Sequence, residues 1–188
     1  MADSVFLRRL SRWQAEQQRE TFADLWVEAY RGVAGRMFQD RQEFLRRFAD
    51  ELSRPGFDMM IGGSASDTVA CAYGFRADRN DGSWQRLDAG LLPGVEELTA
   101  SGQVFAVAEL MVLPAHRREG VATRMLEQLL TRADSALAIA RVEGANEQAG
   151  VAFRAWGWTP VERAPLGRYE HPHRGTRATQ FWTHRLTR

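Results

Sequence analysis

The sequence predicts a mixed α/β fold in which one central sheet carries helices on both faces. Strand and helix patterns follow one another as strand, helices, strands and then a strand–helix–strand–helix unit, an order typical of such a sheet. Apolar residues make up 44% of the chain, enough for a core, and charged residues make up 26%. The length of 188 residues predicts a single domain over residues 1–188.

The N-terminal half predicts one strand, two helices and a hairpin. Residues 5–10 suit a short strand, and residues 15–33 repeat apolar side chains at helical spacing. Residues 40–52 show the same helical repeat and stop before a Pro-Gly pair. Residues 57–61 and 68–75 are strand candidates separated by a glycine-rich turn, which predicts that they pair as a hairpin.

Residues 104–113 form the clearest strand pattern, because they are apolar on both faces as in the middle of a sheet. Before them lies a long polar segment, residues 76–103, which is either a binding loop or a plain surface insertion. After them, the apolar rows of residues 119–132 predict a helix. The remaining expected elements are a strand at 136–142, a helix at 146–156, strands at 158–162 and 179–186, and a polar loop at 168–175.

Charge and composition exclude several function classes. The 25 basic and 24 acidic residues leave a net charge of +1, which gives no bulk attraction to nucleic acid or to an anionic membrane. No apolar run is long enough to span a bilayer, and the first residues lack the apolar segment of a signal peptide. The single cysteine, Cys71, lies in an apolar strand pattern typical of a core thiol. We therefore expect a cytoplasmic protein without bound metal, nucleic acid or membrane partner.

The most informative stretch begins where the central strand ends at Pro114. A short basic loop with Arg117 and Arg118 follows, and Gly120 opens the next helix. Amides at a helix N-terminus lack partners within the helix and point outward with a positive dipole. Because Gly120 and Ala122 are small, a diphosphate can approach these amides closely. The pattern Arg-x-x-Gly-x-Ala is weak by itself, and an ordinary helix start with nearby basic residues is the alternative.

Two motifs, in this order, resemble the GNAT superfamily of acetyl-CoA-dependent N-acetyltransferases. Residues 110–114 and 117–122 match the family's Gln/Arg-x-x-Gly-x-Gly/Ala signature after a strand that ends in Leu-x-Val-x-Pro. The second motif runs from Asn146 through Phe153 to Gly157 and looks like Asn-x-x-Ala-x-x-x-Tyr-x-x-x-Gly-Phe. The resemblance implies a mostly antiparallel sheet with a splayed central strand pair, and acetyl-CoA as the acyl donor in the slot between these strands.

The resemblance also implies a cofactor-binding half at about residues 104–161. The main chain of residues 110–112 would pair with the pantetheine as an added strand would, and the amides of residues 117–122 would hold the diphosphate. Asn146 would contact the pantetheine arm or a nearby main chain. The implied cofactor-binding residues are Leu110, Met111, Val112, Arg117, Arg118, Glu119, Gly120, Val121, Ala122, Asn146 and Phe153.

The second motif departs from the family at Phe153, where a tyrosine often acts as general acid for the departing thiolate. Three explanations stay open. Another residue or a water protonates the thiolate, the thiolate leaves unaided because a thiol has a pKa of roughly 8.5, or the protein binds acyl-CoA and is a poor enzyme. Tyr169 and His171 precede the last strand, a connection that borders the acceptor cleft in the family, and either is a candidate replacement acid.

Glu109 is the candidate base that takes the proton of the acceptor amine. It is the only charge within residues 104–113, and along a strand it shares a face with Met111 and Leu113. The resembled family often places an acid on this strand, facing the acceptor. The alternative is a structural glutamate that pairs with an arginine to hold the sheet together.

We predict that an acetyl group passes directly from acetyl-CoA to a primary amine, with no covalent enzyme intermediate. The favoured acceptor is a small-molecule amine, because acidic residues and Trp84 in residues 76–103 attract a cation, although arginines there offset part of that charge. These acidic residues are Asp78, Asp81, Asp88, Glu96 and Glu97.

Other interpretations stay open. The acceptor could be the N-terminus of a peptide or protein instead of a small molecule. A non-catalytic acyl-CoA-binding or regulatory module is a different class, supported by Phe153. A nucleic-acid binder is supported only by the arginine-rich residues 163–188, and the nearly neutral charge of the chain opposes it. The resemblance also allows a homodimer.

Overall fold

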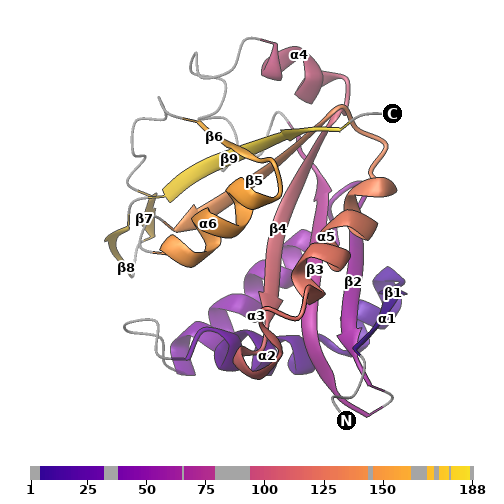
Figure 1. Ribbon diagram of the computed structural model, residues 1–188, viewed down its shortest axis with the longest axis vertical. Helices are drawn as coiled ribbons and strands as arrows, with labels where there is room; N and C mark the ends of the chain where they lie inside the picture. The colour runs from indigo at the N-terminus through magenta and orange to yellow at the C-terminus, as the bar shows by residue number, and fades with distance from the viewer. Residues whose placement is uncertain are drawn as a thin grey trace. The chain divides into compact units, whose positions relative to one another are not determined.

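A computed structural model describes residues 5–31, 38–64, 66–78, 94–143, 146–161, 169–171, 174–177 and 179–186; the side chains of residues 38–40, 143 and 169–179 are outside that description. The chain divides into two compact units (Figure 1). The first unit holds residues 1–75 and 108–133, and the second holds residues 76–107 and 134–188. The single domain over residues 1–188 and the cofactor-binding half at 104–161 stay predictions.

Seven strands form a mixed, mostly antiparallel sheet in the order β1-β2-β3-β4-β5-β9-β6, which confirms the predicted fold class. They are β1 (Phe6–Leu10), β2 (Asp58–Gly63), β3 (Thr68–Arg76), β4 (Val104–Val112), β5 (Leu137–Glu143), β6 (Thr159–Pro160) and β9 (Thr179–Arg185). Antiparallel pairing of β2 with β3 confirms the predicted hairpin. Parallel pairing joins Val104–Val107 of β4 to Leu137–Ala140 of β5. The splay of β4 from β5 stays a prediction.

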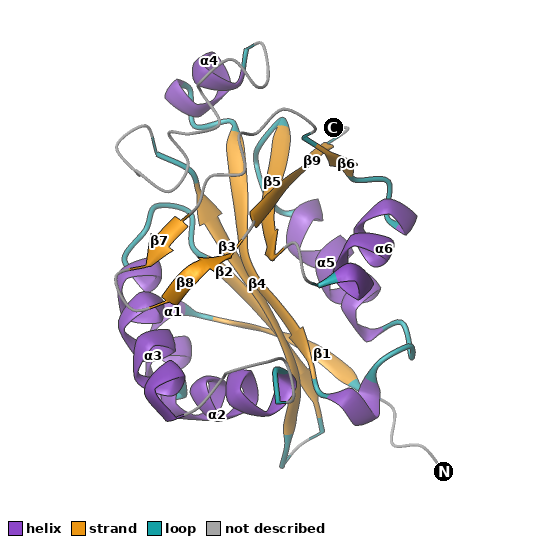
Figure 2. Cartoon of the chain, turned by 90° about the vertical axis from the view of Figure 1, so that its left-hand side faces the viewer, coloured by secondary structure: helices purple, strands orange, loops and turns teal. Residues whose placement is uncertain are grey.

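Helices cover both faces of the strands in the first unit. They are α1 (Arg12–Gln17), α2 (Arg19–Ala29), α3 (Phe38–Leu52) and α5 (Val121–Thr131). Figures 1 and 2 show α1, α2 and α3 on one face and α5 on the other. Alternation along the strands sends one set of side chains into the core that contains α1–α3. That set is Met59, Ile61, Cys71, Tyr73 and Met111.

The second unit contains the first half of β4, strands β5, β6 and β9, and two helices, α4 (Val95–Ala100) and α6 (Glu147–Ala155). A separate antiparallel pair, β7 (Tyr169–His171) and β8 (Arg174–Arg177), replaces the polar loop expected at residues 168–175. The segment 76–103 also differs from expectation, because it contains α4. Glu96 and Glu97 lie in the first turn of α4, where negative charge suits the helix dipole. Residues 79–93, with Trp84, lie outside the described residues.

The helix expected at residues 15–33 is wrong in its start and in its continuity, because the structure has α1 and α2 separated at Gln18. Ser11 and Gln14 form a capping box, in which the Ser11 Oγ accepts from the Gln14 amide at 3.3 Å and the Gln14 Oε1 accepts from the Ser11 amide at 2.9 Å. This cap satisfies two amides at the helix start and therefore begins α1 at Arg12. No helix in the described part of the chain is both long enough and apolar enough to cross a bilayer.

Phe48 of α3 lies at the centre of the first unit's core and is fully buried. Its ring lies 5.1–6.2 Å, between centroids, from those of Phe22, Phe44, Phe57 and Tyr73. Phe48→Ala should lower the free energy of unfolding by about 3–5 kcal/mol, because it removes these contacts and leaves a cavity. Phe6→Ala is the matched control, since Phe6 is 72% exposed, and should cost less than about 1 kcal/mol. Urea denaturation measures both; equal losses would contradict this placement of the core.

Candidate functional site

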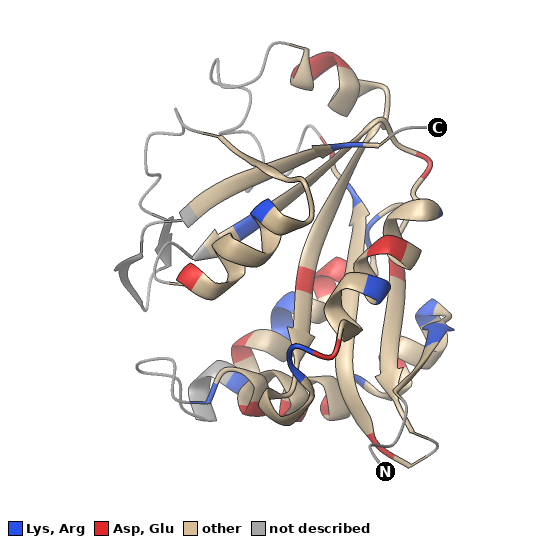
Figure 3. Ribbon diagram, in the orientation of Figure 1, with Lys and Arg blue, Asp and Glu red and all other residues tan. Residues whose placement is uncertain are grey.

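One charged side chain lies within β4. In Figure 3, β4 is drawn in tan except for one red band, which marks an acidic residue. The sequence identifies this residue as Glu109. Glu109 is 8% exposed and lies two residues before Met111, so the two side chains share the strand face that meets the core of α1–α3. Removing a charge from water costs several kcal/mol unless the charge is paired and hydrogen bonded.

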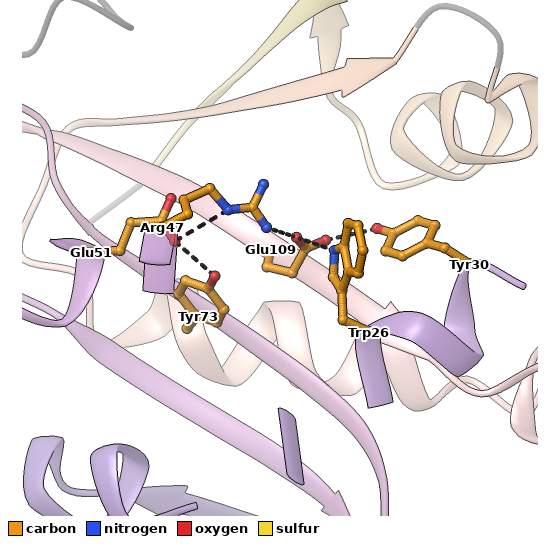
Figure 4. Close-up of polar contacts among 6 residues, drawn as sticks. All are labelled: Trp26, Tyr30, Arg47, Glu51, Tyr73 and Glu109. Carbon is orange, nitrogen blue, oxygen red and sulfur yellow. Dashed lines mark hydrogen bonds and ion pairs between the residues drawn. The ribbon is translucent and has the colours of Figure 1, made fainter. Parts of the chain in front are cut away.

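Three groups donate hydrogen bonds to the Glu109 carboxylate (Figure 4). Tyr30, the residue that ends α2, donates its hydroxyl to Oε1 at 2.7 Å. The Trp26 indole, one turn earlier on α2, donates to Oε2 at 3.2 Å. Arg47 of α3 donates from Nη2 to the same Oε2 at 2.8 Å. The buried carboxylate is therefore charge-paired and hydrogen bonded through both oxygens.

The contacts extend from Arg47 to a second buried carboxylate. Arg47 Nε lies 3.9 Å from Glu51 Oε2, one turn later on α3, and the Tyr73 hydroxyl of β3 donates to that oxygen at 2.8 Å. We call these six residues, drawn in Figure 4, the Glu109 cluster: Trp26, Tyr30, Arg47, Glu51, Tyr73 and Glu109. The cluster ties α2, α3, β3 and β4 of the first unit together.

The electrostatics of the cluster keep Arg47 charged and Tyr73 neutral. Burial alone would lower the pKa of Arg47, but the neighbouring acidic groups, the carboxylates of Glu109 and Glu51 among them, outweigh burial and raise that pKa above its usual value. Burial and the charge of Glu51 raise the pKa of Tyr73. Burial, with a contribution from Glu109, also raises the pKa of the Cys71 thiol, which is fully buried as predicted.

The turn after β4 brings a left-handed backbone to the start of α5. A short 3-10 helix, η2 (Pro114–His116), leads to a left-handed backbone at Arg118 (φ 65°) and at Gly120 (φ 72°), and Gly120 is the N-cap of α5. Gly120 has no side chain to cap α5, and the first amides of an α-helix receive no hydrogen bond from within the helix. A Cβ built on Gly120 would meet no described atom within 4 Å, which leaves open space beside these amides.

The sequence predicts Arg117 as a cofactor-binding residue, and in the structure its guanidinium is bonded to two main-chain carbonyls. Its Nε donates to the Val112 carbonyl at 3.0 Å and its Nη2 to the Ala29 carbonyl at 2.5 Å. These bonds fasten the turn to the end of β4 and to the end of α2. Main-chain amides, together with the exposed side chain of Arg118, are therefore what this turn offers to a phosphate.

The other predicted site residues lie in the second unit. Asn146 is the N-cap of α6, and its Oδ1 accepts from the Ala149 amide at 3.1 Å. Phe153 is 6% exposed and packs in an aromatic group. Its neighbours are Trp156, Trp158 and Trp182, with ring centroids 4.9–5.8 Å away. Tyr169 contributes its main chain to β7, and its side chain lies outside the described part.

In the first unit, β4 leads directly from Glu109 through residues 110–112 to the turn that contains residues 117–122, so these predicted residues are brought onto one strand and its following turn. Sequence reasoning missed the partners of Glu109, which lie 62 to 83 residues away along the chain. One signal was available: polar side chains one turn apart lie beside the buried apolar rows of α2 and α3. They are Trp26 with Tyr30, and Arg47 with Glu51.

The model of the acetyltransferase (GNAT) family matches residues 10–158 of this chain. Similar solved structures include PH1933 from Pyrococcus horikoshii OT3, 12% identical, with a TM-score of 0.68 over 98% of this chain and 100% of that chain. Another is yncA from Salmonella typhimurium, solved with acetyl-CoA, which is 13% identical, with a TM-score of 0.62 over 98% of this chain and 95% of that chain. A third is EctA from Paenibacillus lautus, solved with L-2,4-diaminobutyric acid and coenzyme A, which is 17% identical, with a TM-score of 0.59 over 96% of this chain and 93% of that chain. These likenesses show the fold. No curated protein sequence matches the chain significantly.

Replacing Arg47 tests whether the Glu109 cluster supports the first unit. Arg47→Met leaves Glu109 and Glu51 without their cation, which costs about 3–5 kcal/mol in a fully buried pair. Because the Arg47 side chain is 38% exposed, we expect a smaller loss of about 2–3 kcal/mol in the free energy of unfolding. Urea denaturation provides the measurement.

Arg41→Met is the matched control on the same helix. Arg41 also bridges two carboxylates, Glu20 at 2.8 Å and Asp24 at 2.7 Å, but these are 57% and 68% exposed. Exposed pairs contribute roughly 0–1 kcal/mol, so Arg41→Met should cost less than about 1 kcal/mol. Equal losses for the two variants would show that burial of the cluster adds nothing to stability.

Proposed function

Because the chain belongs to the acetyltransferase (GNAT) family, an acetyl-CoA-dependent group of enzymes, we propose that it acetylates a primary amine of a small molecule by direct attack in a ternary complex. The single observation that carries this proposal is the buried, fully hydrogen-bonded Glu109 on β4, the strand that leads into the phosphate-binding turn. Glu109 is the final acceptor of the amine's proton. We expect the protein to act in the cytoplasm.

Acetyl-CoA fits the turn after β4. Its diphosphate is an anion, and the uncapped amides of α5 with the open space beside Gly120 suit an anion held by main-chain donors. Residues 117–122 would hold this diphosphate, and the main chain of residues 110–112 would pair with the pantetheine. When bound, acetyl-CoA supplies the thioester to be attacked; this chain's own residues bind it, orient the amine and accept the proton.

The charge of the Glu109 cluster supports an amine acceptor. Two carboxylates and one guanidinium leave a net charge of −1 in largely buried surroundings, which favours the approach of a cation. The ring of the half-buried Tyr30 adds a face on which an ammonium group is stabilised. EctA, a similar structure solved with a small diamino acid, is consistent with a small-molecule acceptor.

A second candidate function is a non-catalytic acyl-CoA-binding module. One observation favours it: Phe153, at the family's general-acid position, is enclosed by three tryptophans and has no proton to donate. A thiolate with a pKa of roughly 8.5 leaves without a general acid at neutral pH, so we retain the enzyme as the proposal. Binding of acetyl-CoA without thiol release on a broad amine panel would favour the module instead.

Gly120→Ala should weaken acetyl-CoA binding about tenfold or more, because its methyl group would occupy the open space beside the α5 amides. Gly94→Ala is the matched control. Gly94 is the N-cap of α4 with φ 85°, and a Cβ there also meets no described atom within 4 Å. Both variants should lose roughly 1–2 kcal/mol of stability to the left-handed backbone. Titration calorimetry with acetyl-CoA measures the affinities; an unchanged dissociation constant in Gly120→Ala would contradict the cradle.

Glu109→Gln should lower kcat by about 10²–10⁴ in a thiol-release assay with the best amine of a panel, because the proton acceptor is removed. Its acetyl-CoA affinity should stay the same. Glu51→Gln is the matched control: it also removes one carboxylate from Arg47 and leaves the other in place, and it should lower kcat at most about tenfold. If both variants lose the same activity, the role of Glu109 is structural.

A further inference from the structure

The three donors around Glu109 differ in whether they can carry a proton. Arg47 is a guanidinium whose pKa its neighbours raise, so it neither gives up nor accepts a proton in this setting. The Trp26 indole N–H is a donor only and has no basic lone pair. The Tyr30 hydroxyl is both a donor and an acceptor. Among the described groups that contact Glu109, Tyr30 alone can pass a proton on.

The two oxygens of Glu109 separate these roles. Oε2 accepts from Trp26 at 3.2 Å and from Arg47 at 2.8 Å, the two groups that cannot relay a proton. Oε1 accepts from the Tyr30 hydroxyl at 2.7 Å, a distance typical of a good O–H···O bond. Oε1 is therefore the oxygen to which a proton can be delivered, and Tyr30 already holds a proton directed at it.

The exposure of Glu109, Trp26 and Tyr30 also bears on how an amine reaches the carboxylate. Glu109 is 8% exposed and Trp26 is 5% exposed, so an acceptor amine has little direct access to the carboxylate. Tyr30 is half-buried and ends α2, where the chain leaves the helix. Its phenol joins the enclosed carboxylate to a part of the first unit that retains contact with solvent.

We propose that Tyr30 is a catalytic residue that relays the proton of the acceptor amine to Glu109, an inference that rests on the acetyltransferase function proposed above. The acceptor ammonium donates a proton to Tyr30 Oη as the Tyr30 hydroxyl proton passes to Glu109 Oε1. One N–H and one O–H bond break and two O–H bonds form, so Tyr30 ends neutral, Glu109 ends protonated and the amine ends neutral. The neutral amine then has the lone pair that acyl transfer requires.

The charged and titratable groups that face Tyr30 and Glu109 come from each element packed around them. Arg47 and Glu51 approach from α3, and Tyr73 and Cys71 lie on β3. Burial raises the pKa of both β3 groups, which keeps them protonated near neutral pH. Arg47 stays cationic, and of the two carboxylates Glu109 is the one that accepts from the Tyr30 hydroxyl, so Glu109 receives the relayed proton.

Tyr30→Phe removes only the relaying hydroxyl. With an alkylamine acceptor near pH 7, kcat/KM should fall about 10²–10⁴-fold, while the dissociation constant for acetyl-CoA stays that of the wild type. Tyr73→Phe is the matched control, because it removes a fully buried phenol hydroxyl that donates to the other carboxylate of the cluster at 2.8 Å. Its kcat/KM should stay within about threefold of the wild type.

The pH dependence separates a relay from a structural role. As the pH rises from about 7 toward the alkylamine's own pKa of roughly 10, more of the amine is already neutral and needs no relay. The deficit of Tyr30→Phe relative to the wild type should therefore shrink as the pH rises. Tyr30→His restores a group that can accept and donate a proton, and it should recover part of the activity at pH 7.

Each outcome decides the proposal. A Tyr30→Phe variant that binds acetyl-CoA and stays within about threefold of wild-type kcat/KM would overturn the relay and leave the acetyltransferase function standing. A large deficit that is the same at every pH, or that His does not relieve, would also overturn it and assign Tyr30 a structural role. A wild-type protein that releases no thiol with any amine would overturn the proposed function and the relay with it.

Discussion

The carboxylate of Glu109, placed in the middle of an otherwise apolar strand, is the constraint on which the first unit depends. Burying one charge without partners costs a free energy that can exceed the net free energy of unfolding of a whole domain. α2 and α3 must therefore present donors at fixed places, and they do so with Trp26, Tyr30 and Arg47. The packing of these two helices on the sheet is set by hydrogen-bond geometry as well as by the aromatic core beneath them.

An apolar residue at position 109 would make this strand simpler to bury. Replacing a buried ion pair by apolar side chains of similar volume is often neutral or stabilising, so the pair is weak evidence for a purely structural role. Keeping Glu109 requires Arg47, and Arg47 in turn lies beside Glu51, whose carboxylate accepts the Tyr73 hydroxyl. Several polar groups are thus ordered in a core to hold one carboxylate, an arrangement that the proposed proton chemistry would explain and sheet packing alone does not. The structural and catalytic interpretations of Glu109 use the same contacts and are compatible.

The sequence predicted those features of the fold that depend on residues close together in the chain. The apolar run of β4, the helix start at Gly120 and the hairpin of β2 with β3 each depend on neighbouring residues, and the structure places them as expected. The capping box at Ser11 is equally local and was overlooked. The partners of Glu109 could not be predicted in the same way, because Trp26 lies 83 residues away and only the tertiary packing of α2 brings it to the strand. Arg117 shows the same limit, since its bond to the Ala29 carbonyl fixes the turn through a contact 88 residues away.

One strand, β4, sets the positions of both the Glu109 carboxylate and the turn that we propose binds phosphate. Glu109 and Leu113, the residue before η2, are four residues apart, which spans roughly 13 Å of extended chain. β4 is buried between the helices of the first unit, and Arg117 fastens the turn back to the Val112 carbonyl and to α2. Because Tyr30 ends α2, the proposed relay, the proposed base and the proposed anion cradle would all be positioned by β4 and α2. Holding reacting groups in fixed register supplies a large part of the rate in a two-substrate transfer, so this arrangement would suit the direct attack that we propose.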